Sequence, residues 1–289
     1  MAAAPLISIL IAARNAAQVL PRCLDSIRAQ TFREFEVIVM DAGSADGTAD
    51  LLGASGDVVA LWRSEPDGGI SNAWNKALAA ARGEWFCILG ADDWLWDEGA
   101  LERLAPHLRR AAPRYRIVYG QIRQLDASGR LIEQLGEPWE DFKRRFRSHA
   151  CLPHPGLMHH RSLYETRGGF DERFKFAADY EYLLRELAAG DALFVPALVA
   201  GVGWGGLTAA PENYVASMRE TEAVLRMHGL RPPAFTWAYW KLLAYVYAGL
   251  RALVGPRLAR RMADFYRVAS LRKPRYAAID GGGREGPAR

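Results

Sequence analysis

Four strand-like runs of mostly apolar residues occur in the N-terminal part of the chain, and each ends at a cluster of polar residues. The runs are Leu6–Ala12, Glu36–Met40, Val58–Trp62 and Trp85–Leu89. Helical segments separate them, and a repeat of strand and helix produces a parallel sheet with crossover helices. Sheets of this kind bind ligands beyond the carboxyl ends of their strands. We therefore expect the polar clusters to converge on one edge of a sheet and to form a binding site.

The polar cluster after the fourth run is the most informative, because it holds two adjacent carboxylates. The clusters are Arg14 and Asn15; Asp41, Ser44 and Asp46; Glu65 and Asp67; and Asp92 with Asp93. Mg2+ usually takes one or two carboxylates from a protein and leaves its other positions to phosphate and water. Aspartate also stabilises turns, so an Asp-Asp pair alone is weak evidence for a cation site. The position of Asp92 and Asp93 beside the other polar clusters is what favours cation binding.

Beyond residue 113 the pattern of the sequence changes. Residues 117–135 predict a β-hairpin, because two strand-like runs flank a short turn-forming segment. Residues 136–156 are expected to be irregular. Asp179–Ala189 has the apolar spacing of a helix, and Phe194–Val202 predicts a further strand. From Pro211 onward the pattern is helical.

A series of short motifs runs through the N-terminal part of the chain in a specific order. The motifs are Ser8–Asn15, Gln30–Phe32, Glu36–Asp41, Gly43–Thr48, Glu65–Ile70, Asn75–Ala77, Ala81–Glu84 and Ala91–Trp94, with looser matches at His154–Gly156, Gly168–Asp171 and Ala178–Glu181. In order and spacing they resemble the inverting glycosyltransferases of family 2, which have the GT-A fold. The looser matches are typical of members that build bacterial surface glycans.

The resemblance implies an α/β protein with a Rossmann-like, mostly parallel central sheet flanked by helices and followed by a C-terminal helical extension. We expect a GT-A domain over residues 1–205, divided into a nucleotide-sugar-binding half (1–112) and an acceptor half (113–205). Residues 206–276 would form the helical extension. Residues 277–289 would be a flexible tail, since Gly281–Arg289 lacks core-forming residues.

The resemblance also implies which residues bind the donor and its cation. Contacts to the nucleotide or the donor are expected from Ala12, Arg14, Asn15, Asp41, Asp67, Gly69, Asn75, Lys76, Ala91, Asp92 and Asp93. Asp92 and Asp93 are the expected ligands of a divalent cation, Mn2+ or Mg2+. Family members often carry a further aspartate at the position of Gly90, so which of the two carboxylates binds the metal directly stays open.

An inverting transfer needs a base that takes the proton of the acceptor hydroxyl as it attacks the anomeric carbon. By its position in the family pattern Asp179 is expected to be that base, with Glu181 and Asp171 as alternative carboxylates. The competing interpretation is that Asp179 is the N-cap of the helix that follows it, and the two roles are compatible. His154 is expected to contact the acceptor. A bound cation would stabilise the negative charge on the departing diphosphate.

The expected activity is that of a hexosyl- or hexosaminyltransferase. Its donor would be a nucleotide-diphospho-sugar, with UDP favoured, and its acceptor a hydroxyl of a glycan or of a lipid-linked molecule. The alternative is a nucleotide-sugar-binding scaffold with little or no catalysis in a glycan assembly complex. Sugar nucleotidyltransferases and dinucleotide-binding dehydrogenases are disfavoured, because Ala12–Asn15 is not the glycine-rich phosphate loop that follows their first strand.

The positive charge of the chain is concentrated at its C-terminus. Residues 251–289 contain ten arginine and lysine residues against three acidic ones. Since the rest of the chain is not basic, no nucleic acid partner is expected. The aromatic segment 234–254 contains Lys241, and a charge inside a membrane span is costly. Two interpretations stay open: residues 234–275 lie on a membrane surface, or the segment packs on protein.

The three cysteines are far apart in the sequence and lack the spacing of metal ligands. They are Cys23, Cys87 and Cys151. A reducing compartment is therefore expected. The predicted location is the cytoplasm, at the inner face of the cell membrane if the C-terminal helices bind lipid.

Overall fold

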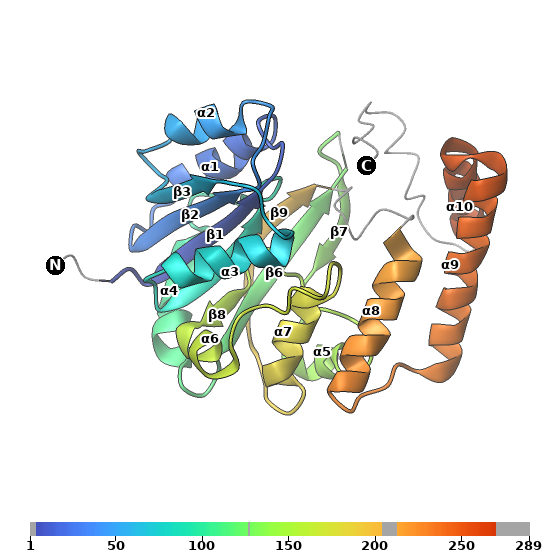
Figure 1. Cartoon of the computed structure of the whole chain (residues 1–289). Coiled ribbons are helices and arrows are strands. Elements are labelled where there is room, and N and C mark those ends of the chain that lie inside the picture. Colours follow the sequence, from blue (N-terminus) through green and yellow to red (C-terminus); the bar gives the residue numbers. More distant parts are fainter. Residues whose placement is uncertain (1–3, 127, 204–212, 270–289) are drawn as a thin grey trace.

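The computed structural model describes residues 4–126, 128–203 and 213–269. Its strands are β1 (Ile7–Ala13), β2 (Phe35–Asp41), β3 (Leu61–Ser64), β4 (Trp85–Gly90), β5 (Trp94–Leu95), β6 (Ile117–Leu125), β7 (Leu131–Leu135), β8 (Met158–His160) and β9 (Leu193–Gly203). Its helices are α1 (Leu20–Arg28), α2 (Thr48–Gly53), α3 (Ile70–Ala80), α4 (Ala100–Ala111), α5 (Trp139–Phe146), α6 (Arg161–Arg167), α7 (Ala178–Leu187), α8 (Tyr214–Met227), α9 (Ala234–Val254) and α10 (Pro256–Ala269). Within these residues the strands form one central sheet with helices packed around it (Figure 1).

The first four predicted strands form the parallel half of this sheet, in the spatial order β3-β2-β1-β4. Successive side chains of a strand point to opposite faces. Ile9 accordingly packs in a core with α1 and α4, whereas Leu10 packs in a second core with α3 and α7. Both faces are covered, which explains why these strands are almost continuously apolar.

The second half of the chain continues the sheet through antiparallel pairs. β8 lies between β4 and β6 and runs antiparallel to both, and the predicted hairpin of β6 and β7 is confirmed. β9 pairs in parallel with β6. The sheet is therefore parallel over β1 to β4 and mixed beyond them.

Two local predictions were wrong, and two short strands were missed. β3 begins at Leu61 rather than Val58, because the N–H groups of Val58 and Val59 donate to the carbonyl of Ser55 in a turn. Residues 136–156 are not wholly irregular, since they include α5, whose Trp139 and Phe146 are buried on one side of the helix. The strands β5 and β8 were not predicted, because two or three residues carry no detectable periodicity.

The expected helical extension consists of α8, α9 and α10. These helices follow one another along the chain and lie to one side of the sheet (Figure 1). Val224 and Leu225 of α8 belong to the core that contains α7. Glu222 of α8 pairs with Lys241 of α9 at 2.5 Å, so one face of α9 packs on protein. Among the described helices, none combines the length and hydropathy that a membrane span requires. The expected domain boundary at residues 205 and 206 and the tail 277–289 lie outside the described residues.

Candidate active site

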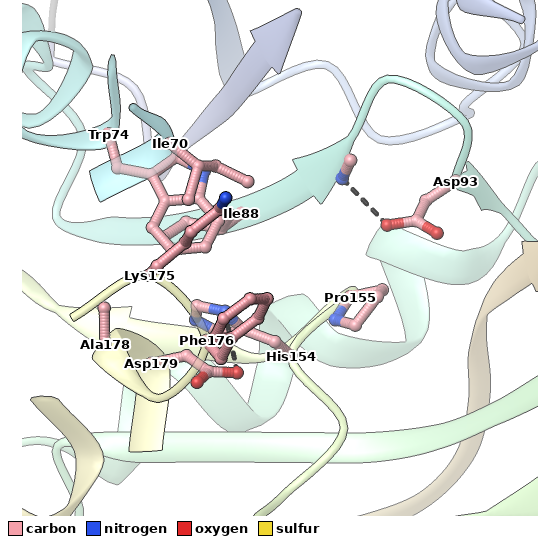
Figure 2. Close-up of a pocket in the computed structure, with 11 residues that line it drawn as sticks. Ile70, Trp74, Ile88, Asp93, His154, Pro155, Lys175, Phe176, Ala178 and Asp179 are labelled. Atoms are coloured by element: carbon pink, nitrogen blue, oxygen red, sulfur yellow. Dashed lines mark hydrogen bonds and ion pairs between the residues drawn. The ribbon is translucent and has the colours of Figure 1, made fainter. Parts of the chain in front are cut away.

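A cavity of about 200 Å³ lies where the carboxyl end of β4 meets the first turns of α3 and α7 (Figure 2). It is lined by Ile70, Trp74, Ile88, Gly90, Asp93, His154, Pro155, Lys175, Phe176, Ala178 and Asp179. The metal-binding candidate Asp93 and the base candidate Asp179 therefore face one cavity from different walls, although they come from opposite halves of the catalytic region.

Asp93 is held by the backbone of its own turn. Its Oδ2 accepts a hydrogen bond from the N–H of Gly90 at 2.8 Å, and the N–H of Asp93 donates to the carbonyl of Gly90 at 3.1 Å. Burial raises the pKa of Asp93 to about 7, and the negative charge of neighbouring Asp92 adds to this shift. Asp92 is exposed and does not line the cavity. Of the two carboxylates, Asp93 is thus the one directed into the cavity.

Glycine at position 90 leaves room for the two carboxylates of this turn. A Cβ atom there would lie 2.8 Å from Oδ2 of Asp93 and 2.9 Å from Oδ1 of Asp92. These separations are shorter than real Cβ contacts, so a larger residue would displace the two carboxylates. Family members often carry aspartate at this position. Glycine here allows Asp92 and Asp93 to lie where they do.

The donor set at this turn fits a hard cation that also binds phosphate. Within the described residues no three His, Cys, Asp or Glu side chains gather into a metal-binding cluster. Two adjacent carboxylates that leave the remaining positions to phosphate and water are the usual protein contribution to an Mg2+ site. Oxygen ligands and a partly buried carboxylate with a raised pKa are consistent with such an ion.

Asp179 lies in the first turn of α7, where the helix dipole favours negative charge. The prediction that it caps this helix was wrong, because α7 begins one residue earlier and its N-cap is Ala177, without a side-chain cap. Oδ1 of Asp179 accepts from the N–H of Tyr180 at 2.7 Å. The side chain of Asp179 is 28% exposed, so an incoming hydroxyl can reach it.

Glu220 of α8 holds the segment that leads into α7. Its carboxylate accepts hydrogen bonds from the N–H groups of Lys175, Phe176 and Ala177 at 3.1, 2.7 and 3.0 Å. This residue was not predicted to contribute to the site, since nothing in the sequence distinguishes it from other charged residues of an amphipathic helix. The first helix of the extension thereby positions the segment that carries Asp179.

The alternative carboxylates for the base are engaged elsewhere. Glu181 is buried and pairs with Arg185 and His228, and Asp171 pairs with Arg173 at 2.6 Å. Neither of the two lines the cavity. Of these three carboxylates, Asp179 is therefore the one that lines the cavity.

The first three polar clusters meet at the ends of β1, β2 and β3. The N–H of Asn15, whose φ of 48° is in the left-handed region, donates to Oγ of Ser44 at 2.7 Å. Asp41 is 2% exposed, and its Oδ2 accepts from the N–H of Ser44 and from Oγ of Ser64. Register places Ala12 beside Gly90, which joins these clusters to the acidic turn.

The remaining donor candidates lie around the start of α3. Oδ1 of Asp67 accepts from the N–H of Gly69, whose φ of 116° favours glycine, and Lys76 pairs with Glu65 at 2.6 Å. Asn75 points elsewhere: its Oδ1 accepts from the N–H of Phe170 at 2.7 Å, which joins the two halves. Arg14 is exposed at the end of β1, and Ala91 is buried in the acidic turn.

Two histidines lie behind Asp179. Nε2 of His154 is 3.1 Å from Nε2 of His159, and Nδ1 of His154 is 4.0 Å from Oδ2 of Asp179. Burial lowers the pKa of His154 and lowers that of His159 strongly, so both rings are neutral at neutral pH. His154 also lines the cavity.

Comparison with known proteins adds independent findings. The family model described as Glycosyl transferase family 2 matches residues 8–166. A PGL/p-HBAD biosynthesis glycosyltransferase of Mycobacterium bovis is 33% identical over 187 residues, which covers 63% of this chain and 70% of the relative. The chondroitin synthase of Pasteurella multocida is 31% identical over 183 residues, covering 63% of this chain and 19% of the synthase.

Solved structures share the fold at low sequence identity. The S. aureus protein TarS in complex with UDP-GlcNAc has a TM-score of 0.59 and 18% identity, covering 75% of this chain and 66% of that one. The mannosyltransferase PcManGT from Pyrobaculum calidifontis in complex with GDP-Man and Mn2+ has a TM-score of 0.61 and 18% identity, covering 95% and 83%. The α/β fold expected from the sequence is confirmed by these likenesses.

Proposed function

This chain belongs to glycosyl transferase family 2 and is a glycosyltransferase, and we propose that it transfers a sugar from a nucleotide-diphospho-sugar to an acceptor hydroxyl with inversion. In this proposal Asp179 is the general base, and Asp92 and Asp93 hold Mn2+ or Mg2+. The observation that carries it is that Asp93 and Asp179 line the same cavity. The same observation favours an enzyme over a binding scaffold, because a scaffold needs no carboxylate opposite the cation site.

The donor would bind with its diphosphate beside the acidic turn and its nucleotide along the ends of β1 and β2. A bound cation supplies positive charge to the diphosphate, which lowers the energy of its departure. Helix α3 begins at Ile70, which lines the cavity. The free N–H groups at the N-terminus of a helix favour the binding of phosphate. We propose a UDP-sugar as the donor, a choice supported by the family resemblance and by the UDP-GlcNAc complex of TarS.

Transfer then needs one proton acceptor on the far side of the sugar. Asp179 would take the proton of the acceptor hydroxyl while the hydroxyl oxygen forms the bond to the anomeric carbon. The bond from that carbon to the diphosphate breaks in the same step, which inverts the configuration. The hydrogen bonds of Glu220 to the segment before α7 would keep the carboxylate of Asp179 in place during this step.

Donor binding tests the proposal directly. We expect Mn2+ with UDP or a UDP-sugar to raise the melting temperature of the full chain. A ligand at one hundred times its dissociation constant stabilises a protein by about 2.7 kcal/mol. EDTA should abolish the shift, and GDP with Mn2+ serves as the matched comparison. Release of UDP from the donor in the presence of acceptor extracts would report transfer. A chain that responds to no nucleotide with either metal would contradict the proposal.

We further propose that α9 and α10 lie on an anionic membrane surface and so bring the enzyme to a lipid-linked acceptor. Exposed apolar residues recur at helical spacing on each helix and together are called the apolar stripe: Phe235, Tyr239, Leu242, Val246 and Leu253 on α9, and Leu258, Met262 and Phe265 on α10. Trp240, Tyr245 and Val254 of α9 are exposed outside this spacing. Phe235, Leu253 and Phe265 are 94%, 84% and 77% exposed. Exposed Arg257 and Arg261 on α10 supply the positive charge that favours anionic lipid.

Vesicle binding tests this apolar stripe. The full chain should sediment with vesicles of phosphatidylcholine and phosphatidylglycerol and much less with phosphatidylcholine alone. The triple variant Phe235→Ser, Leu253→Ser, Phe265→Ser should lose this binding, because each change removes exposed apolar area from the lipid contact. Leu131→Ser, at an exposed apolar site on β7, is the control and should bind as the wild type does. Absence of vesicle binding, or a dimer that forms through the stripe instead, would contradict membrane attachment.

A further inference from the structure

We propose that buried His159 and His154, which lines the cavity, form a hydrogen-bonded pair that positions the carboxylate of Asp179 for proton transfer. This inference rests on the proposed function, since it gives the base of that reaction its support. Neither histidine would touch the reacting atoms, so both are positioning residues.

The three side chains form a line from the interior of the sheet to the cavity. His159 lies in β8, where its backbone pairs with Phe86 of β4 and Ile117 of β6, and its side chain is 1% exposed. Its Nε2 is 3.1 Å from Nε2 of His154, and Nδ1 of His154 is 4.0 Å from Oδ2 of Asp179. Figure 2 shows the last of these contacts at the cavity wall. The inner end of the line is thus anchored in the sheet.

The tautomers of the two histidines follow from one ring nitrogen of His159 that has no hydrogen-bond partner among the described residues. Nδ1 of His159 is buried and has no hydrogen-bond partner in the part of the chain that the structure describes. A buried N–H group without a partner is rarer than a buried acceptor without one, so the proton of this ring belongs on Nε2. His159 then donates to Nε2 of His154, and the proton of His154 must lie on Nδ1. The N–H group of His154 therefore points at Asp179.

The surroundings of the pair keep both rings neutral and fixed. The ring of Trp74 meets His154 edge-on at 5.4 Å between centroids, and the ring of Tyr182 lies 5.4 Å from His159. Burial lowers the pKa of both imidazoles. A neutral ring with a fixed tautomer can favour the negative carboxylate through its N–H dipole without adding a charge to the cavity.

Other titratable groups also face Asp179. Sγ of Cys151 is 4.0 Å from its Oδ2, and burial raises the pKa of that thiol, so the thiol stays neutral. Lys175 and Asp93 line the same cavity. A separation of 4.0 Å between His154 and Asp179 is longer than a hydrogen bond. Catalytic contacts of this kind often tighten when substrate binds, and a movement of about 1 Å would close this one.

The test compares two variants of the inner histidine. His159→Leu removes the donor to His154, whereas His159→Gln keeps an N–H donor at a similar distance from the backbone. We expect His159→Leu to lower kcat about tenfold with the KM for the donor nearly unchanged, because partners behind a functional group typically contribute 10- to 100-fold. His159→Gln should recover most of this loss, because it again supplies a donor to His154.

A second measurement determines the tautomers of His154 and His159 directly and does not depend on enzyme activity. Nitrogen NMR of the two imidazoles should show the proton on Nδ1 in His154 and on Nε2 in His159, and Asp179→Asn should shift the His154 signals. Opposite tautomers would overturn the inference. It would also be overturned if His159→Leu kept the wild-type kcat, or if both variants lost the same activity together with thermal stability. Wild-type protein that binds donor but shows no transfer would instead contradict the proposed function and, with it, this role.

Discussion

Replacing Asp179 with asparagine should lower kcat by about a thousandfold while leaving binding of UDP and Mn2+ within about twofold of wild type. General base catalysis typically contributes 10²–10⁴ in rate, and asparagine has a similar shape but cannot take the proton. The donor and its cation would bind at the acidic turn on another wall of the cavity, so their affinity should not depend on this carboxylate. Steady-state transfer kinetics and calorimetric titration with UDP and Mn2+ would measure the two effects separately.

Asp171→Asn provides the matched control for this experiment. Asp171 precedes α7 and pairs with Arg173, and it does not line the cavity. Its loss should change kcat by less than about twofold, within the range expected for a residue outside the reacting site. Near-normal turnover in Asp179→Asn would remove Asp179 from the role of base, and a large loss in Asp171→Asn would reopen the choice of carboxylate.

Replacing Asp93 with asparagine should have opposite effects on function and on stability. Binding of UDP with Mn2+ should fall at least about tenfold, because the cavity loses the charge that would hold the cation. In metal-free buffer with EDTA the variant should be more stable than wild type at pH 8, by at least about 1 kcal/mol. Burial raises the pKa of Asp93 from 3.8 to about 7, so ionisation of this group opposes folding.

The pH dependence gives this prediction its sign. Below about pH 4 the aspartate is protonated in both the folded and the unfolded chain, and the variant gains nothing. Between pH 4 and 7 the unfolded chain releases the proton while the folded chain keeps it, so the stability of the wild type falls as pH rises. Above pH 7 Asp93 is ionised in both states, and the full free-energy cost of burying its charge lowers the stability of the wild type. Urea unfolding at pH 4, 6 and 8 would follow this difference.

Asp92→Asn is the comparison: Asp92 is exposed, and its charge supplies only the smaller part of the pKa shift of Asp93, so this variant should gain less stability at pH 8 than Asp93→Asn. The comparison also shows which carboxylate matters more for the cation. Equal loss of UDP and Mn2+ binding in both variants would mean that the two carboxylates share the ion. A variant of Asp93 that is no more stable at pH 8 and binds UDP with Mn2+ normally would rule out the cation site described above.

Much of the parallel half was predictable because its pattern is local. The apolar runs around Ile9 and Ile38 show that both faces of those strands are covered, and polar residues show where the strands end. Helices of ten residues or so, such as α3 and α7, are long enough to display their spacing. The prediction for residues 136–156 failed because α5 is short and is stabilised by Trp139 and Phe146, whose partners lie far along the chain.

The strand–helix order of the parallel half, the sheet edge at which the polar clusters meet, and the family could all be inferred from the amino-acid sequence, because each of these depends on residues close together in the chain. Two features follow only from how the chain folds: Asp93 turns into the cavity while Asp92 stays outside it, and Glu220 holds the segment before Asp179. The same is true of the contact between His154 and His159 across the start of β8. Such contacts are set by packing between elements. The periodicity of one segment shows which of its faces is buried, but it does not show which side chains of another segment pack against that face.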